Sequence, residues 1–93
     1  MNIQVLRVVK VTGGGNLRAF ADVRVGEITI CDCKVIQQLG QRAYVTGPQK
    51  QVGERWYPLV KMSGGLRDRV QACVLQEAVN RGLVAANDDL EEQ

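Results

Sequence analysis

Residues 17–36 read LRAFADVRVGEITICDCKVI and contain two strand-like segments separated by a Gly-Glu pair. In the first segment, small and apolar side chains occupy every second position: Leu17, Ala19, Ala21, Val23 and Val25. Polar or larger side chains fill the positions between them, which is typical of a strand that buries one face. The Gly-Glu pair is short enough for a tight connection to residues 28–36. The stretch therefore predicts an antiparallel hairpin.

The segment before this hairpin also alternates, over residues 3–11. One face would carry Ile3, Val5, Arg7, Val9 and Val11, and the other Leu6 and Val8. Residues 12–16, TGGGN, indicate a turn because glycine and asparagine adopt positive φ easily. The three glycines could instead cradle a phosphate, but the lysine and the following helix of a phosphate-binding loop are missing. We expect a hairpin turn here.

Shorter segments follow the central hairpin. Residues 43–45 predict a short fourth strand. Residues 47–53, GPQKQVG, are bounded by glycine and proline and predict an exposed loop that carries Lys50. Residues 55–60 are a candidate fifth strand, which Pro58 would confine to an edge or interrupt. Together these segments predict an antiparallel meander of four to five strands.

The last third of the chain has helical periodicity. Ser63 is a suitable N-cap, and Gly82 is a suitable residue just beyond the end of a helix. One apolar stripe consists of Leu66, Val70, Cys73, Val74 and Ala78. A second stripe, Ala72, Leu75 and Val79, lies on nearly the opposite side of the helix. Two apolar faces predict burial against the sheet and also against either another subunit or residues 83–86.

These elements predict an α+β fold, a small antiparallel meander sheet packed with one main C-terminal helix. A chain of 93 residues forms one domain with a modest core, which we assign to residues 1–87, followed by an acidic tail at 88–93. No stretch approaches the ~20 apolar residues of a membrane span. A signal peptide begins with a basic segment followed by a long apolar run, and residues 1–4 do not begin such a pattern. We therefore expect a cytoplasmic protein.

The composition removes most catalytic mechanisms. The chain has no histidine, and its single serine, Ser63, has no base or signature motif near it. Cys31 and Cys33 would share a strand face, but no histidine completes a metal site with them, so we expect buried or half-buried free cysteines. Asp22 and Asp32 lack neighbours that would split their pKa values, which predicts solvated or hydrogen-bonded surface acids. We expect no enzymatic activity, no metal ion and no cofactor.

Charge is distributed unevenly along the chain. The net charge is +2, from twelve Lys/Arg and ten Asp/Glu residues. Four of the acids lie in the last six residues, so residues 1–87 hold twelve basic residues against six acidic ones, a charge of +6. A basic body with an acidic tail is typical of a protein with a polyanionic partner, for which the tail is an electrostatic decoy. The alternative is a solvated domain with a frayed polar terminus.

Residues 63–69, SGGLRDR, form a candidate anion site. A helix N-terminus presents free N–H groups and a positive dipole end, and the glycines allow a phosphate to approach. Arg67 and Arg69 supply charge and bidentate donors, although they point to different sides of the helix. The alternative is a glycine-rich loop that leads into an ordinary helix.

Four motifs, in this order, resemble the stage V sporulation protein G (septation protein SpoVG) family over about residues 1–80. They are Leu17-x-Ala19-x-Ala21-x-Val23, Ile30-x-Asp32-x-Lys34-Val35-Ile36, Gly40-x-x-Ala43-Tyr44-Val45-x-Gly47-Pro48 and Arg67-x-Arg69-Val70-Gln71-x-x-Val74-Leu75. Residues 47–50, 56–59 and 64–66 depart from the family pattern. The resemblance implies a small dimeric bacterial protein with an antiparallel sheet and a C-terminal helix. It also implies a regulator that binds DNA and RNA, with roles in septum formation and sporulation.

The resemblance places the nucleic-acid contacts on the C-terminal helix region, where the basic residues are Arg67 and Arg69. We expect Lys50, Arg55 and Lys61 to add to this basic surface. The overall prediction is a non-enzymatic nucleic-acid-binding regulator that forms a homodimer, with no membrane contact and no small-molecule substrate.

Two alternatives stay open at this point. Trp56 and Tyr57 could stack on bases, as aromatic residues of single-strand binders do, or lie in the core or a dimer contact. The whole chain could instead be a protein-interaction module in a septation or cell-division pathway without direct nucleic-acid binding. In that case the two-faced helix and the two aromatic residues would dock another protein.

Overall fold

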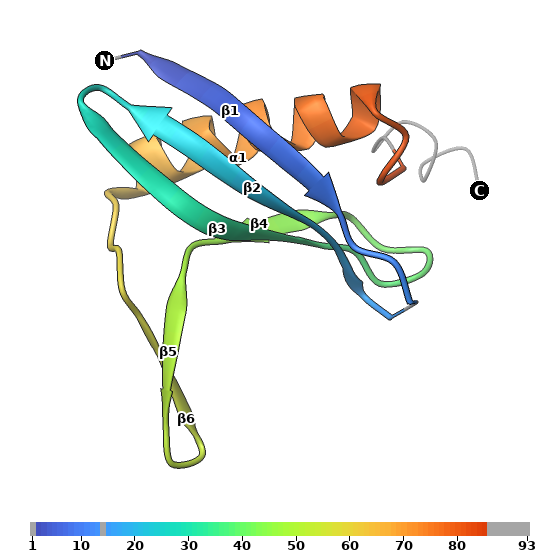
Figure 1. Ribbon diagram of the computed structural model, residues 1–93, viewed down its shortest axis with the longest axis horizontal. Helices are drawn as coiled ribbons and strands as arrows, with labels where there is room; N and C mark the ends of the chain where they lie inside the picture. Colours follow the sequence, from blue (N-terminus) through green and yellow to red (C-terminus); the bar gives the residue numbers. More distant parts are fainter. Residues whose placement is uncertain (1, 14, 86–93) are drawn as a thin grey trace.

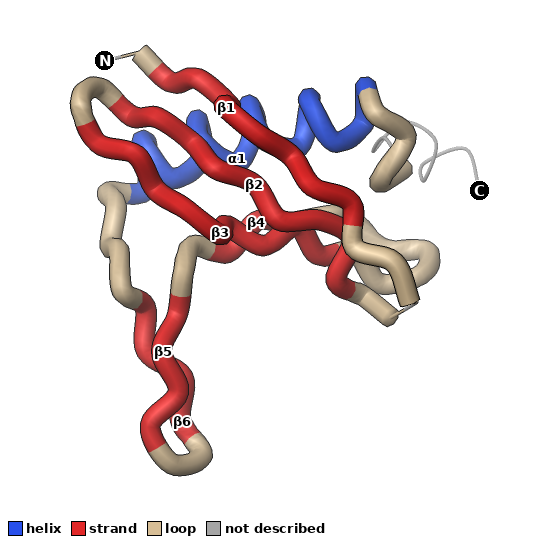
Figure 2. The backbone as a smooth tube through the Cα atoms, viewed as in Figure 1, coloured by secondary structure: helices blue, strands red, loops and turns tan. Residues whose placement is uncertain are grey.

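The computed structural model describes residues 2–13 and 15–85 and has the predicted α+β architecture. Four antiparallel strands form the main sheet in the order β1 (Ile3–Lys10), β2 (Leu17–Val25), β3 (Ile28–Ile36) and β4 (Tyr44–Thr46). A separate two-stranded ribbon, β5 (Gln49–Val52) and β6 (Arg55–Pro58), precedes α1 (Gly64–Asn80). Figures 1 and 2 show α1 across one face of the main sheet and the ribbon standing away from it. Within the described residues, no helix has the length and apolar character needed to cross a membrane.

The β2–β3 hairpin has the predicted bounds and lies at the centre of the sheet. Val25 pairs with Ile28 across the turn, where Gly26 adopts a φ of 61° that glycine tolerates best. The alternate residues of β2 are buried, as predicted: Ala19, Ala21, Val23 and Val25. They share the core with Val70, Val74 and Ala78 of α1. One face of the sheet is thus the core, and the other face is open.

A β-bulge in β1 overturns the predicted division of its faces. Leu6 lies between two consecutive cross-strand pairs, Val5 with Val23 and Arg7 with Asp22. One extra residue moves every later side chain to the opposite face of the sheet. Val8 is therefore buried in the core, whereas Val9 pairs with Phe20 and is 38% exposed. The expectation that residues 3–11 keep one face is wrong.

A second register shift occurs in β3, where an extra residue lies opposite the interval between Ala21 and Val23. Asp32, at this shift, adopts a φ of 59°, a left-handed conformation that is uncommon outside glycine. The shift separates two thiols, because Cys31 is exposed and Cys33 is buried. The predicted common face for these two cysteines is therefore wrong, as is the predicted burial of Cys31. The three cysteines are free, as predicted.

The ribbon corrects the prediction of a loop at residues 47–53. β5 pairs with β6 from Gln49 opposite Pro58 to Val52 opposite Arg55. β6 ends at Pro58, which cannot itself donate a ladder bond, and the N–H of Leu59 donates to the carbonyl of Pro48 just beyond it. The predicted fifth strand therefore belongs to this ribbon and not to the main sheet. Every residue of β5 and β6 is exposed, and we call residues 49–58 the arm.

α1 begins and ends at the predicted residues. Ser63 is the N-cap, and its Oγ accepts a hydrogen bond from the N–H of Leu66 at 3.4 Å. At the other end, Gly82 has a φ of 71° and donates to the carbonyl of Val79, while Leu83 donates to the carbonyl of Ala78. These two bonds form a Schellman motif, which satisfies the last carbonyls of the helix.

The prediction of two apolar faces on α1 is wrong. Cys73 and Ala72 are exposed, although each was assigned to an apolar stripe. Leu75 and Val79 are partly buried and pack against the same core as Val74. The helix thus has one broad apolar face toward the sheet, and it leaves no second stripe for another subunit.

Gln37 fastens the segment after α1 to the end of β3. Its side chain is buried, donates to the carbonyl of Gln41 at 2.9 Å, and accepts from the N–H of Ala85 at 3.0 Å. Val84 adds to the core beside it. The predicted acidic tail, residues 88–93, lies outside the described residues.

Candidate nucleic-acid interface

The start of α1 retains two features of the predicted anion site. Ser63 caps the N–H of Leu66, and the N–H of Arg67 donates to the carbonyl of Ser63 at 2.8 Å. The amides of Gly64 and Gly65, in the first turn, have no intrahelical acceptor by the geometry of an α-helix. Beyond the local backbone, no atom lies within 4 Å of where a Cβ would stand on either glycine, so no side chain fills the space beside this turn.

A cavity of about 460 Å³ brings Arg67 and Lys61 together. It lies between the end of β4, the base of the arm and the first turns of α1, and Gly47 and Gln71 also line it. The rest of the lining is largely apolar and includes Val45, Val60 and Met62. The two cations are therefore the groups at this cavity that can attract an oxyanion.

Arg69 does not line this cavity, although it is exposed. This placement agrees with the prediction that Arg67 and Arg69 point to different sides of the helix. The two arginines at the start of the helix therefore lie apart, and Arg67 shares its cavity with Lys61.

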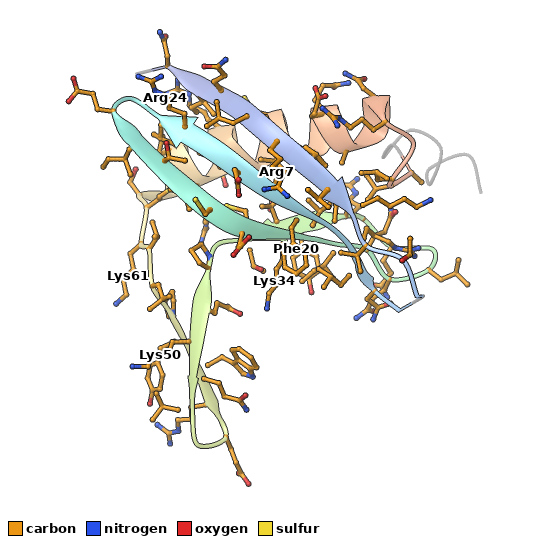
Figure 3. The ribbon with its side chains drawn as sticks, in the orientation of Figure 1. Arg7, Phe20, Arg24, Lys34, Lys50 and Lys61 are labelled. Carbon is orange, nitrogen blue, oxygen red and sulfur yellow. The ribbon has the colours of Figure 1, made fainter. Side chains whose placement is uncertain are left out.

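Lys50 and Arg55 lie on one face of the arm. Lys50 is opposite Tyr57 and Val52 is opposite Arg55, and alternate residues of paired strands share a face. Figure 3 shows Lys50 and Lys61 projecting to the same side of the molecule. We call Lys50, Arg55, Lys61 and Arg67 the basic strip. Within residues 2–13 and 15–85, none of the four forms an ion pair with a carboxylate.

The sequence prediction missed a second group of side chains, on the face of the main sheet that α1 leaves open. Figure 3 shows Arg7, Phe20, Arg24 and Lys34 on this open face. Arg7 was assigned to the face of Ile3, because nothing in the alternation of residues 3–11 reveals a bulge. The alternation of β2 did give a signal, since Phe20 and Arg24 occupy its outward positions.

Two carboxylates lie among these residues. The N–H of Asp32 donates to Oδ1 of Asp22 at 3.0 Å, so the prediction of hydrogen-bonded surface acids is confirmed. A small cavity of about 120 Å³ lies beside them, lined by Arg7, Val9, Phe20, Asp22 and Asp32.

The open face continues toward the arm through Lys34. Its backbone pairs with that of Phe20, and its Nζ lies 5.3 Å from the centroid of the Trp56 ring. A cation at this distance from an indole face is held by the ring quadrupole. Trp56 therefore lies next to the open face, on the side of the arm opposite to Lys50.

Cys33 lies under the open face, in the core. Burial of the thiol and then the negative charges of Asp22, Cys31 and Asp32 raise the pKa of Cys33 from 9.0 to about 11. The thiol is therefore protonated at neutral pH, and a protonated thiol is neither a nucleophile nor a metal ligand.

No protein-family model matches the chain, and a search of curated proteins finds no significant match. The case for a function therefore rests on the surface chemistry of the chain.

Proposed function

We propose that this protein is a non-enzymatic nucleic-acid-binding regulator of the SpoVG type, which binds DNA or RNA as a homodimer in the cytoplasm. The observation that carries this proposal is the basic strip, with four cations that have no acidic partner among the described residues. Cations arranged in this way attract a phosphate backbone and release its condensed counterions. The resemblance to the SpoVG family supports the same function.

The components of the strip have different expected roles. Arg67 presents a planar guanidinium that can hold a phosphate with two hydrogen bonds, next to the free amides of the first helical turn. Lys61 adds a point charge at the same cavity. Lys50 and Arg55 extend the contact along the arm, where Tyr57 lies opposite Lys50 and can stack on a base.

The test is the salt dependence of binding for two double variants. Each phosphate contact adds about 0.7 to the slope of log K against log salt for a single strand and about 0.9 for duplex DNA. We therefore expect Lys61→Ala with Arg67→Ala, and separately Lys50→Ala with Arg55→Ala, to flatten this slope by roughly 1.4 to 1.8 units per protomer. Fluorescence anisotropy with random-sequence oligomers at several salt concentrations measures it.

A matched control removes two cations elsewhere. Lys10 and Arg42 are exposed; Lys10 pairs with the core-facing Ala19, and Arg42 lies in the β3–β4 connection, so both are outside the basic strip. Lys10→Ala with Arg42→Ala should leave the slope nearly unchanged. The proposal is wrong if both strip variants stay folded and bind with the affinity and salt slope of the parent protein.

A second candidate function is a protein-interaction module in a septation or cell-division pathway. The observation that favours it is the apolar surface of the arm region, where Val52, Trp56 and Leu59 are 55%, 54% and 62% exposed. Exposed apolar side chains of this size commonly mark a protein contact. Failure of the parent protein to bind any oligomer at low salt would favour this candidate.

The proposed homodimer accounts for the same apolar residues without excluding nucleic acid. Val52 and Leu59 share the face of the arm that carries Lys50 and Arg55, because Leu59 continues the pairing by donating to the carbonyl of Pro48. Lysine and arginine can bury their stems while their head groups stay in solvent. A contact over the apolar side chains therefore leaves the cations at its rim.

A further inference from the structure

Two of the three register shifts of the main sheet converge on one residue. Asp22, at the middle of β2, pairs with Arg7 just after the bulge in β1 and lies opposite the shift in β3. The first shift turns Arg7 and Val9 to the open face, and the second brings the N–H of Asp32 to Oδ1 of Asp22. Bulges commonly re-aim side chains at binding sites. Here they assemble the cavity lined by Arg7, Val9, Phe20, Asp22 and Asp32.

We propose that this cavity is a base-recognition pocket that takes a guanine from a single-stranded nucleic acid. The inference rests on the proposed function and adds to it the class of ligand and the preferred base. The pocket combines three kinds of group: carboxylates that accept hydrogen bonds, a guanidinium that donates them, and an aromatic ring that can stack.

The donor and acceptor pattern of the pocket matches the Watson–Crick edge of guanine. Guanine has N–H donors on two neighbouring nitrogens, and a carboxylate with two oxygens accepts from both. Oδ1 of Asp22 is fixed by the N–H of Asp32, so the carboxylate is already oriented, and its Oδ2 has no partner among the described residues. Arg7, which also has no partner in the described part of the chain, can donate to the guanine O6.

The negative charge of the pocket decides how a nucleic acid can approach it. Asp22 and Asp32 repel phosphate, so a strand must present a base edge at this point and its backbone elsewhere. A base within a duplex has its Watson–Crick edge occupied, which leaves single strands as the ligand. The cavity, at about 120 Å³, is also well below the roughly 300–1,000 Å³ of pockets for free small ligands. It suits one base of a longer chain.

The rest of the open face provides a path for that chain. Phe20 forms one wall of the pocket, Lys34 is its partner on β3, and the Lys34 ammonium lies over Trp56. An aromatic ring, a cation and a second aromatic ring thus follow one another from the pocket toward the arm. Single-strand binding surfaces use such a sequence, with bases on the rings and phosphates near the cations. An arginine-bearing peptide would also suit two carboxylates and a ring, but Arg7 and Lys34 oppose it.

The test compares short oligouridylates that carry one guanine, adenine or cytosine, with binding measured by fluorescence anisotropy at fixed salt. We expect the guanine oligomer to bind the parent protein about fivefold or more tightly than the others, since one good bidentate base contact gives this discrimination. Asp22→Asn should remove the preference, because the amide cannot accept from both donors. Its oxygen can still accept from the N–H of Asp32, so the variant is expected to fold.

Two further variants separate this pocket from its surroundings. Glu27→Gln removes one negative charge from the exposed β2–β3 turn and should keep the guanine preference. Phe20→Leu should weaken binding of every oligomer by about fivefold or more through loss of stacking. None of these variants should change the salt slope that the basic strip sets.

The outcomes distinguish the pocket from the proposed function. Binding with the expected salt slope but without base preference overturns the pocket alone. A folded Asp22→Asn protein that keeps the guanine preference, or a preference for an arginine-rich peptide over all the oligomers, also overturns it. Absence of binding to any oligomer overturns the proposed function and the pocket together.

Discussion

The side-chain amide of Gln37 joins two segments that are far apart in the chain, at Gln41 and Ala85. Gln37→Leu would leave the N–H of Ala85 without its partner, and an unsatisfied buried donor costs about 1–3 kcal/mol. We expect the free energy of unfolding, measured by urea denaturation, to fall by about that amount. Gln38→Leu, at an exposed neighbour, should change it by less than about 0.5 kcal/mol. Equal effects of the two substitutions would show that the hydrogen bonds of the Gln37 side chain do not contribute to stability.

Cys33 gives the folded protein a pH dependence at the alkaline end. The unfolded thiol loses its proton near pH 9, whereas the folded thiol keeps it until about pH 11. The folded state therefore binds more protons in this window, and stability should fall as the pH rises through it. The free energy of unfolding, measured across roughly pH 8 to 11, should therefore decline less steeply with pH for Cys33→Ala than for the parent protein. Parallel curves would contradict the shift.

At the scale of residues, the sequence predicted which side chains belong to the candidate site better than it predicted which of them lie close together. Arg67 was placed correctly at the helix start, because the capping residue and the apolar period locate that helix. Lys61 was predicted as part of the basic surface, but its proximity to Arg67 was not, since this depends on how the arm and the connecting segment turn. Arg7 was missed because its direction depends on a bulge.

At the scale of elements, the end of α1 requires a glycine, whereas its first turn does not. Gly82 has a φ of 71°, so Gly82→Ala should destabilise the protein by about 1 kcal/mol through strain in the Schellman motif. Gly65 lies in the first turn with open space around a Cβ, so Gly65→Ala should be neutral or stabilise it by up to about 1 kcal/mol. Thermal denaturation of the two variants should therefore give midpoint shifts of unequal size. A larger loss for Gly65→Ala than for Gly82→Ala would exclude this account of the helix ends.

The elements that the sequence predicted well are those with one buried face. β2 and β3 have the predicted bounds, because their apolar period records contact with α1. β5 has the sequence QKQV and is exposed throughout, so it has no alternating apolar pattern, and the segment was predicted as a loop. The shifts at Leu6 and Asp32 were also missed, because one extra residue changes the facing of a strand without changing its composition.

At the scale of the whole molecule, we expect a dimer. The radius of gyration is 13.4 Å, above the roughly 12 Å typical of a compact chain of this length, and the arm projects from the body. A two-stranded ribbon without a buried face is marginally stable by itself. Light scattering at micromolar concentration should therefore give about twice the 10.2 kDa of one chain.

Substitutions in the arm region test which surface holds this dimer. Val52→Ser with Leu59→Ser should shift the protein toward the monomer, because it removes apolar side chains that are 55% and 62% exposed in one chain. Leu39→Ser is the control, since Leu39 is 94% exposed but lies in the β3–β4 connection. A parent protein that is monomeric at micromolar concentration would contradict the dimer.

The exposed arm has a consequence for the kinetics of amide hydrogen exchange. Its ladder bonds have no buried side chains to hold them, so opening the arm alone costs much less free energy than unfolding the β2–β3 hairpin. In a single chain, the amides of the arm should exchange early and those of β2 and β3 last. If a second chain covers the arm, its protection instead follows the fraction of dimer and rises with protein concentration. The exchange rate of the arm then reports assembly directly, whereas the central strands exchange only when the whole domain opens.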